Sequence, residues 1–98
     1  MDPIFIEIIT SPNCPHSPKA LKVASKLVSK CKFPVILRES SLETEEGQAR
    51  AYEFLVESTP AILINGKLTF VGVPTAGELK DAVVEAQAKE RDRNTYFF

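Results

Sequence analysis

Hydrophobic residues change their spacing several times along the chain, and each change falls near a turn or helix-capping residue. The first apolar run, Ile4 to Ile9, is almost unbroken and rich in β-branched residues, which is typical of a strand buried on both faces of a sheet. From Ala20 to Cys31 the apolar residues recur at helical spacing, opposite a face of lysines and serines. The pattern predicts a central strand and then an amphipathic helix that begins at about Cys14.

The next segment predicts a second strand and a second helix. Pro34 to Arg38 is a short apolar run, and Ser40 followed by Glu43 resembles a capping box that opens a helix. The apolar positions expected to face the core from this helix are Ala49, Tyr52, Leu55 and Val56.

A β-hairpin is the strongest local prediction. Residues 61–64 and 67–71 form two apolar runs on either side of Asn65 and Gly66. An Asn-Gly pair suits the positive φ angles of a two-residue type I′ turn. We therefore expect two antiparallel strands joined at this dipeptide.

The C-terminal part predicts one more helix. Thr75 and Glu78 have the spacing of a capping box, and apolar residues then recur at helical spacing to about Lys89. Residues 90–98, which end in Tyr96-Phe97-Phe98, are expected to be a frayed tail. The alternative is that the aromatic end docks on this molecule or on a neighbour.

The predicted element order is β-α-β-α-β-β-α. A long crossover between parallel strands places its helix on the sheet, so we expect an α/β fold with a four-stranded mixed sheet and helices on both faces. The whole chain, residues 1–98, is expected to form a single domain with its core at about residues 3–89. Ligand chemistry in such sheets collects at the carboxyl ends of strands, which here points to residues 10–14.

Composition narrows the function classes. The formal charge of −1 and the pI near 5.8 provide no basic field for nucleic acid. Apolar runs are too short for a membrane helix, and the N-terminus lacks the pattern of a signal peptide. Two cysteines are too few for a secreted disulfide scaffold. We therefore expect a cytoplasmic protein with no nucleic-acid or membrane partner and with thiols available for chemistry.

Cys14 is the first candidate for that chemistry. At a helix N-terminus, unpaired backbone N–H groups and the positive end of the helix dipole stabilise a thiolate, which lowers the pKa of the thiol. The thiolate is the attacking species, so Cys14 is predicted to be a nucleophile. The alternative is an inert, half-buried cysteine.

Three segments resemble the small thioredoxin/glutaredoxin-like proteins of archaea. They are residues 11–18 (SPNCPHSP), Thr59-Pro60 before the hairpin, and residues 70–75 (FVGVPT) before the last helix. The resemblance extends over about residues 3–89 and implies the minimal thioredoxin fold. It also implies that Cys14 attacks a partner's disulfide and that Pro60 is cis.

Further roles follow from the same resemblance. The backbone of Thr59 is expected to pair with an extended substrate segment beside Pro60, with Pro15 and His16 also contacting the substrate. An exposed loop histidine with no special role is the alternative for His16. The implied partners are a protein disulfide substrate and an upstream reductase.

Ser17 departs from the family pattern. In members with two active-site thiols this position is the second cysteine, which resolves the mixed disulfide, and a hydroxyl cannot do so. It is instead expected to donate a hydrogen bond to the Cys14 thiolate. Either an external thiol such as glutathione completes the cycle, or the protein holds its partner without turnover as a binding module. A natural serine and a substitution that traps the complex are both compatible with the sequence.

Other residues are excluded from the predicted site. Cys31 lies seventeen residues after Cys14, about 25 Å along one helix, whereas a disulfide needs Cα atoms within about 7 Å, so it is interpreted as a core cysteine. Ile8 replaces a buried acid of larger thioredoxins, with Glu7 on the opposite face. Residues 71–75 lack the carboxylate with which glutaredoxins hold glutathione, so glutathione binding is not supported.

The spacing of Cys14, His16 and Cys31 predicts no metal site, and no cofactor is expected. A row of lysines on the first helix is interpreted as a solvated face, with docking of an acidic partner as the alternative. Its members are Lys19, Lys22, Lys26 and Lys30.

Overall fold

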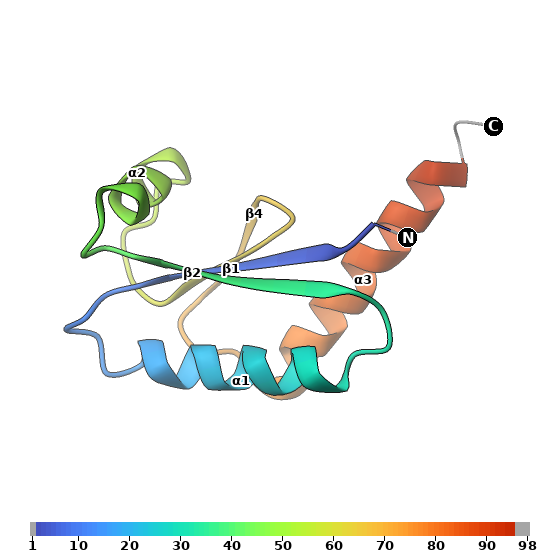
Figure 1. Ribbon diagram of the computed structural model, residues 1–98, viewed down its shortest axis with the longest axis horizontal. Coiled ribbons are helices and arrows are strands. Elements are labelled where there is room, and N and C mark those ends of the chain that lie inside the picture. Colours follow the sequence, from blue (N-terminus) through green and yellow to red (C-terminus); the bar gives the residue numbers. More distant parts are fainter. Residues whose placement is uncertain (1, 96–98) are drawn as a thin grey trace.

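The computed structural model describes residues 2–95, with the surroundings of side chains described through Lys89. It contains the seven elements in the predicted order (Figure 1). Their bounds are β1 (Ile4–Thr10), α1 (Ser17–Lys30), β2 (Val35–Ser41), α2 (Glu45–Glu53), β3 (Ala61–Ile64), β4 (Lys67–Val71) and α3 (Ala76–Thr95). The aromatic end, Tyr96-Phe97-Phe98, lies outside the described residues.

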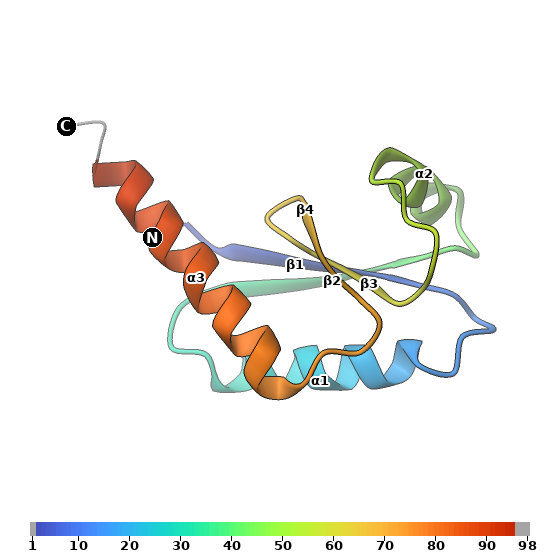
Figure 2. The same ribbon diagram turned by 180° about the vertical axis from the view of Figure 1, so that it is seen from behind.

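The strands form one mixed sheet in the order β2-β1-β3-β4. β1 pairs parallel to β2 and antiparallel to β3, and β3 pairs antiparallel to β4. Helices α1 and α3 lie on one face and α2 lies on the other (Figures 1 and 2). The α/β architecture expected of the minimal thioredoxin fold is thus confirmed.

The interior position of β1 follows from its isoleucines. Ile4, Ile6 and Ile8 point to the α1 and α3 face, where they pack in the larger core cluster. Ile9 points to the other face and packs with Ala51 of α2. All four isoleucines are fully buried, because neighbouring residues of a strand point to opposite faces and both faces of this strand are covered.

The predicted hairpin turn and the capping box predicted at Thr75 are confirmed. Asn65 and Gly66 have φ angles of 51° and 78°, as a type I′ turn requires. The backbone N–H of Thr75 donates to the Glu78 carboxylate at 2.9 Å, and the Glu78 N–H donates to the Thr75 hydroxyl at 3.1 Å. These reciprocal bonds satisfy two backbone donors at the start of α3.

The first two helices begin later than expected. Helix α1 begins at Ser17 and not at Cys14, so Pro15 precedes the helix, and only Pro18 lies in its first turn. β2 continues to Ser41 because it stays paired with β1 to the end of that strand. The cap of α2 is consequently Thr44 and not Ser40, and its hydroxyl accepts a hydrogen bond from Gly47 at 2.9 Å.

The buried face of α2 also differs from the prediction. Ala49 is exposed, Tyr52 is 84% exposed, and Leu55, which lies beyond the end of the helix, is 79% exposed. Gly47 and Ala51 are buried instead. A Cβ at Gly47 would clash with the Ser41 carbonyl oxygen, so α2 approaches the end of β2 too closely for a larger residue at this position. Helix α3 continues to Thr95 and not only to about Lys89, because the residues after Lys89 include no glycine or proline that would end it.

Candidate active site

Cys14 lies in the turn between the end of β1 and the start of α1. Its backbone N–H donates to the Ser11 carbonyl at 3.1 Å, and its carbonyl accepts from the Ser17 N–H at 3.3 Å. These bonds fix the turn directly before the helix. The Cys14 side chain is partly exposed, and its Sγ lies 3.2 Å from the carbonyl oxygen of Thr59.

Thr59 belongs to the segment that leads into β3. The Thr59-Pro60 peptide bond is cis, as the family resemblance implied, and the Pro60 ring is fully buried. The Pro60 carbonyl accepts a hydrogen bond from Gly72 at 2.7 Å, just after β4 ends. Cys14 follows β1 and Thr59 precedes β3, 45 positions later in the chain. The structure therefore brings them together at one end of these two central strands.

Several hydrogen bonds lower the pKa of Cys14 from 9.0 to about 7. The side chain of Thr59 makes the largest contribution, and the side chain of Ser17 follows. Burial opposes them, with an effect larger than that of either backbone N–H group, from His16 and Ser17, that also lowers the pKa. Donors of this kind stabilise the thiolate. The contact with the Thr59 carbonyl opposes them, since a carbonyl oxygen accepts only from the protonated thiol, but the net direction is downward.

Ser17 is the most buried side chain of this loop, with 3% of its surface exposed. Its Oγ accepts a hydrogen bond from the Ser11 N–H at 3.3 Å, so the hydroxyl also holds the loop together. A hydroxyl that accepts one hydrogen bond can still donate its own proton. The Ser17 N–H donates to the Cys14 carbonyl, so the two residues are close in this turn of the chain, and the donor role of the Ser17 hydroxyl stays a prediction.

Pro15 and His16 are exposed beside the cysteine. His16 occupies the N-cap position of α1, but its side chain makes no capping hydrogen bond. Its contribution to the acidity of Cys14 is through the backbone N–H. The sequence singled out His16 but not the contribution of its backbone N–H, because that contribution depends on where the N–H points in the folded loop.

A carboxylate absent from the predicted site lies on the other face of the sheet. Glu7 is 8% exposed, and its two oxygens accept hydrogen bonds from Arg50 of α2 at 2.6 and 2.9 Å. Ser40 donates to the same carboxylate at 2.7 Å. Arg50 is the main cause of the lowered pKa of Glu7. Ile8 is buried on the α1 face of the sheet. Glu7 and Ile8 therefore point to opposite faces, as the alternation along the strand predicted.

Cys31 caps the far end of α1 and packs against the larger core cluster, as the sequence indicated. Both cysteines are free thiols. Among the residues that the structure describes, no three His, Cys, Asp or Glu side chains come together as a metal site requires.

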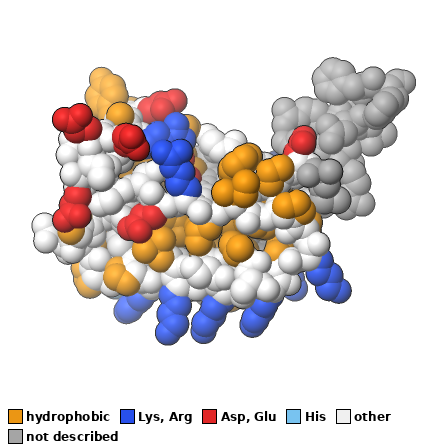
Figure 3. Space-filling model, in the orientation of Figure 1, with side chains coloured by type: hydrophobic (Ala, Val, Ile, Leu, Met, Phe, Trp, Pro, Cys, Tyr) orange, Lys and Arg blue, Asp and Glu red, His pale blue; other side chains and the backbone are white. Residues whose placement is uncertain are grey.

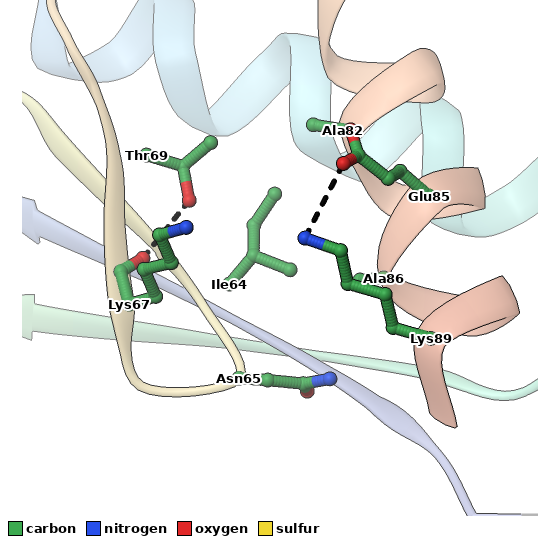
Figure 4. Close-up of a pocket in the computed structure, with 8 residues that line it drawn as sticks. All are labelled: Ile64, Asn65, Lys67, Thr69, Ala82, Glu85, Ala86 and Lys89. Carbon is green, nitrogen blue, oxygen red and sulfur yellow. Dashed lines mark hydrogen bonds and ion pairs between the residues drawn. The ribbon is translucent and has the colours of Figure 1, made fainter. Parts of the chain in front are cut away.

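A separate hollow of about 270 Å³ lies between the hairpin and α3 (Figure 4). Glu85 and Lys89 form an ion pair of 3.3 Å along one of its walls, and the Ile64 side chain lies at its centre. Because Ile64 ends β3 and Thr59 precedes that strand, the hollow is at the opposite end of β3 from Cys14. It plays no part in the thiol site.

A family model described as "Thioredoxin domain" matches residues 4–84, which include every residue of the candidate site. The chain belongs to the thioredoxin family. Across the described residues, no helix is long and apolar enough to pass through a membrane.

This thioredoxin-family chain is similar to two curated archaeal proteins. It is 34% identical over 87 residues to a "Probable Thioredoxin" of Archaeoglobus fulgidus, covering 89% of this chain and 93% of that protein. It is 35% identical over 89 residues to a "Thioredoxin" of Methanocaldococcus jannaschii, covering 91% of this chain and 98% of that protein.

Two solved structures share the fold. One is a protein disulfide oxidoreductase from Aeropyrum pernix, with a TM-score of 0.67 and 38% identity over 82% of this chain, which corresponds to 35% of the longer protein. The other comes from work on thiol resolution in yeast mitochondrial 1-Cys peroxiredoxin, with a TM-score of 0.69 over 86% of this chain and 79% of that one. At 16% identity, the second match shows the fold alone.

Proposed function

We propose that this protein is a thiol-disulfide oxidoreductase of thioredoxin type in which Cys14 is the nucleophile. The observation that carries the proposal is the position of the Cys14 sulfur, 3.2 Å from the backbone of Thr59 and next to Pro60. The names of the archaeal relatives and of the Aeropyrum structure support the same reaction class.

In the first step, the Cys14 thiolate attacks one sulfur of a partner's disulfide. An S–S bond forms between Cys14 and the partner, and the partner's second sulfur leaves as a thiolate that takes a proton from water. An external thiol then attacks the mixed disulfide, since Ser17 has no sulfur to do so. Its attack on the Cys14 sulfur releases the partner's remaining sulfur as a thiolate and leaves Cys14 bonded to the external thiol. A second external thiol then attacks the first one's sulfur, which returns Cys14 as a thiolate and joins the two external thiols in a disulfide that an upstream reductase must reduce.

The substrate backbone is placed by Thr59 in this proposal. An extended segment beside Pro60 pairs with the main chain of Thr59, which holds its disulfide next to the Cys14 sulfur. Exposed Pro15 and His16 border the same sulfur and contact the bound segment. A protein disulfide fits this geometry better than glutathione, because residues 71–75 include no carboxylate or other charged side chain.

A binding module that holds its partner without turnover is the second candidate. The observation that favours it is Ser17, which is built into the loop through its bond to Ser11 and cannot release a mixed disulfide. The two candidates share the attack by Cys14 and differ only in the fate of the mixed disulfide.

Restoring the second thiol tests the proposal. In a Cys31→Ser background, we expect Ser17→Cys to reduce protein disulfides with more turnovers per minute than the parent, with dithiothreitol as electron source. Ser25→Cys adds a thiol on the exposed face of the same helix and is the matched control. The parent should form a Cys14-linked mixed disulfide that mass spectrometry detects. A parent without that adduct refutes the nucleophile, and no gain in Ser17→Cys favours the binding module.

A further inference from the structure

A second site lies on the α1 and α3 face, away from Cys14. It is a groove of about 690 Å³ between the C-terminal half of α1 and the first turns of α3. Its apolar lining residues are Val23, Leu27, Cys31, Phe33, Ala76, Val83 and Val84. Cys14 precedes the other end of α1, so the thiol site does not use this groove (Figures 1 and 2).

The groove is bordered by one sign of charge. Lys26 and Lys30 project from α1, Lys32 follows that helix, and Lys80 comes from α3 on the opposite wall. No lining residue is acidic. Figure 3 shows Lys and Arg side chains projecting along the lower edge of the molecule, where α1 lies in Figure 1. Within residues 2–89, none of the four forms an ion pair.

Both properties of the groove restrict what it binds. A fully hydrated ion would bury no apolar surface on the floor of the groove, so the apolar residues would add little to its binding free energy. An uncharged hydrocarbon would gain little binding free energy from the exposed ammonium groups. A molecule that has an apolar chain and an anionic head satisfies both at once. The head group then lies among the lysine ammonium groups, and the chain lies over the apolar side chains.

The length of the groove favours a small molecule over a protein segment. From Val23 to Cys31 and from Ala76 to Val84, each wall runs for eight helical steps, about 12 Å at 1.5 Å per residue. A stable protein interface buries about 800 Å² on each partner, far more than a groove of this length covers. The volume instead falls within the range of about 300–1,000 Å³ that is typical of small-molecule sites.

We propose that the groove between α1 and α3 binds a small anionic amphiphile, a single apolar chain with a carboxylate or phosphate head. The ligand class is set by the juxtaposed lysines and apolar floor, and not by the chemistry of Cys14. The inference therefore stands or falls independently of the proposed oxidoreductase function.

Cys31 provides a direct readout, because its partly exposed thiol lines the groove. In the full-length Cys14→Ser protein, Cys31 is the single thiol, and its rate of alkylation by iodoacetamide reports access to the floor. Decanoate is the probe, used below the concentration at which it aggregates. We expect saturable protection of Cys31, with octanoate about fifteenfold weaker because it has two fewer methylenes.

Charge variants test the head group. Replacing Lys30 and Lys80 by glutamine is expected to weaken decanoate binding at least about fourfold. The matched control replaces Lys19 and Lys22, exposed lysines of α1 that do not line the groove, and should leave binding unchanged. Circular dichroism verifies that both double variants are folded.

Four results would each overturn the inference. They are absence of saturable protection by decanoate, equal affinity for decanol, equal weakening in the two double variants, and stronger protection by an acidic amphipathic peptide than by decanoate. The last result would assign the groove to a protein partner. A backbone NMR titration, in which shifts must centre on the lining residues, provides an independent measurement of the same binding.

Discussion

The acidity of Cys14 is expected to depend on the side chain of Thr59 more than on any other group. Thr59 makes the largest contribution to lowering the pKa of Cys14. Valine has nearly the shape of threonine but no hydroxyl, so Thr59→Val removes the side-chain contribution to the pKa and keeps the backbone carbonyl that contacts the Cys14 sulfur. The pKa of Cys14 should then rise from about 7 toward 9.0.

The size of the effect on reactivity follows from the two limiting pKa values of Cys14, about 7 and 9.0. At pH 7 a thiol of pKa about 7 is about one-half ionised, and a thiol of pKa 9.0 is about 1% ionised, a ratio of roughly fifty. A more basic thiolate is intrinsically more reactive, by roughly eightfold for two pKa units at a Brønsted coefficient of about 0.45. At pH 7 the net loss for the full shift is therefore about sixfold, and Thr59→Val should lose less than this, because the contributions of Ser17 and of the backbone N–H groups remain.

Alkylation by iodoacetamide between pH 5 and 10 measures both quantities, in a Cys31→Ser background so that a single thiol reacts. The midpoint gives the pKa, and the plateau gives the reactivity of the thiolate. Thr69→Val, an exposed threonine of β4, is the matched control and should leave the profile unchanged. The reasoning is refuted if Thr59→Val titrates at the same pH as the parent, or if the parent titrates near 9.

Two further predictions concern stability. Arg50→Leu leaves the Glu7 carboxylate buried without its cation and, since Arg50 is 32% exposed, should cost about 2 kcal/mol, or about 8–16 °C in Tm. The lowered pKa of Glu7 contributes stability above pH 4.5 that is lost as the pH falls through the folded pKa. The difference between the urea unfolding midpoints at pH 7 and pH 3 should therefore be smaller in the variant than in the parent. Gly47→Ala drives a Cβ into the Ser41 carbonyl oxygen and should cost more than about 3 kcal/mol, whereas Gly77→Ala meets nothing and should stabilise α3 by up to about 1 kcal/mol. A Gly47→Ala protein that melts with the parent would contradict the close approach.

Local signals in the sequence were sufficient for most of the sheet. The Asn65-Gly66 turn defines both of its flanking strands, and the run of isoleucines in β1 requires cover on two faces. Helix α2 was harder to predict because its start depends on how long β2 stays paired with β1. That pairing is a tertiary effect, and it moved the cap from Ser40 to Thr44.

The sequence likewise identified some residues of the candidate site but not the contacts that depend on the fold. Cys14 could be identified from a thiol beside a predicted helix start, whereas Ser17, Thr59 and Pro60 came from the family resemblance. The alternating pattern placed Glu7 on the far face, but it could not identify Arg50 as its partner, 43 positions away. The lysines of α1 were visible as a face, yet the groove depends on where α3 crosses that helix, which no spacing within either helix specifies.

The two halves of the thiol site come from segments 45 positions apart, so the enhanced acidity of Cys14 exists only while the chain is folded. An unfolded copy has an ordinary thiol, mostly protonated at neutral pH, and is a poor nucleophile. At pH 7, misfolded molecules should therefore form adducts with other disulfides more slowly, by about sixfold for a thiol of pKa 9.0. Reactivity and structural integrity are lost together, which makes the labelling rate of one sulfur a measure of the fraction of intact protein in a sample.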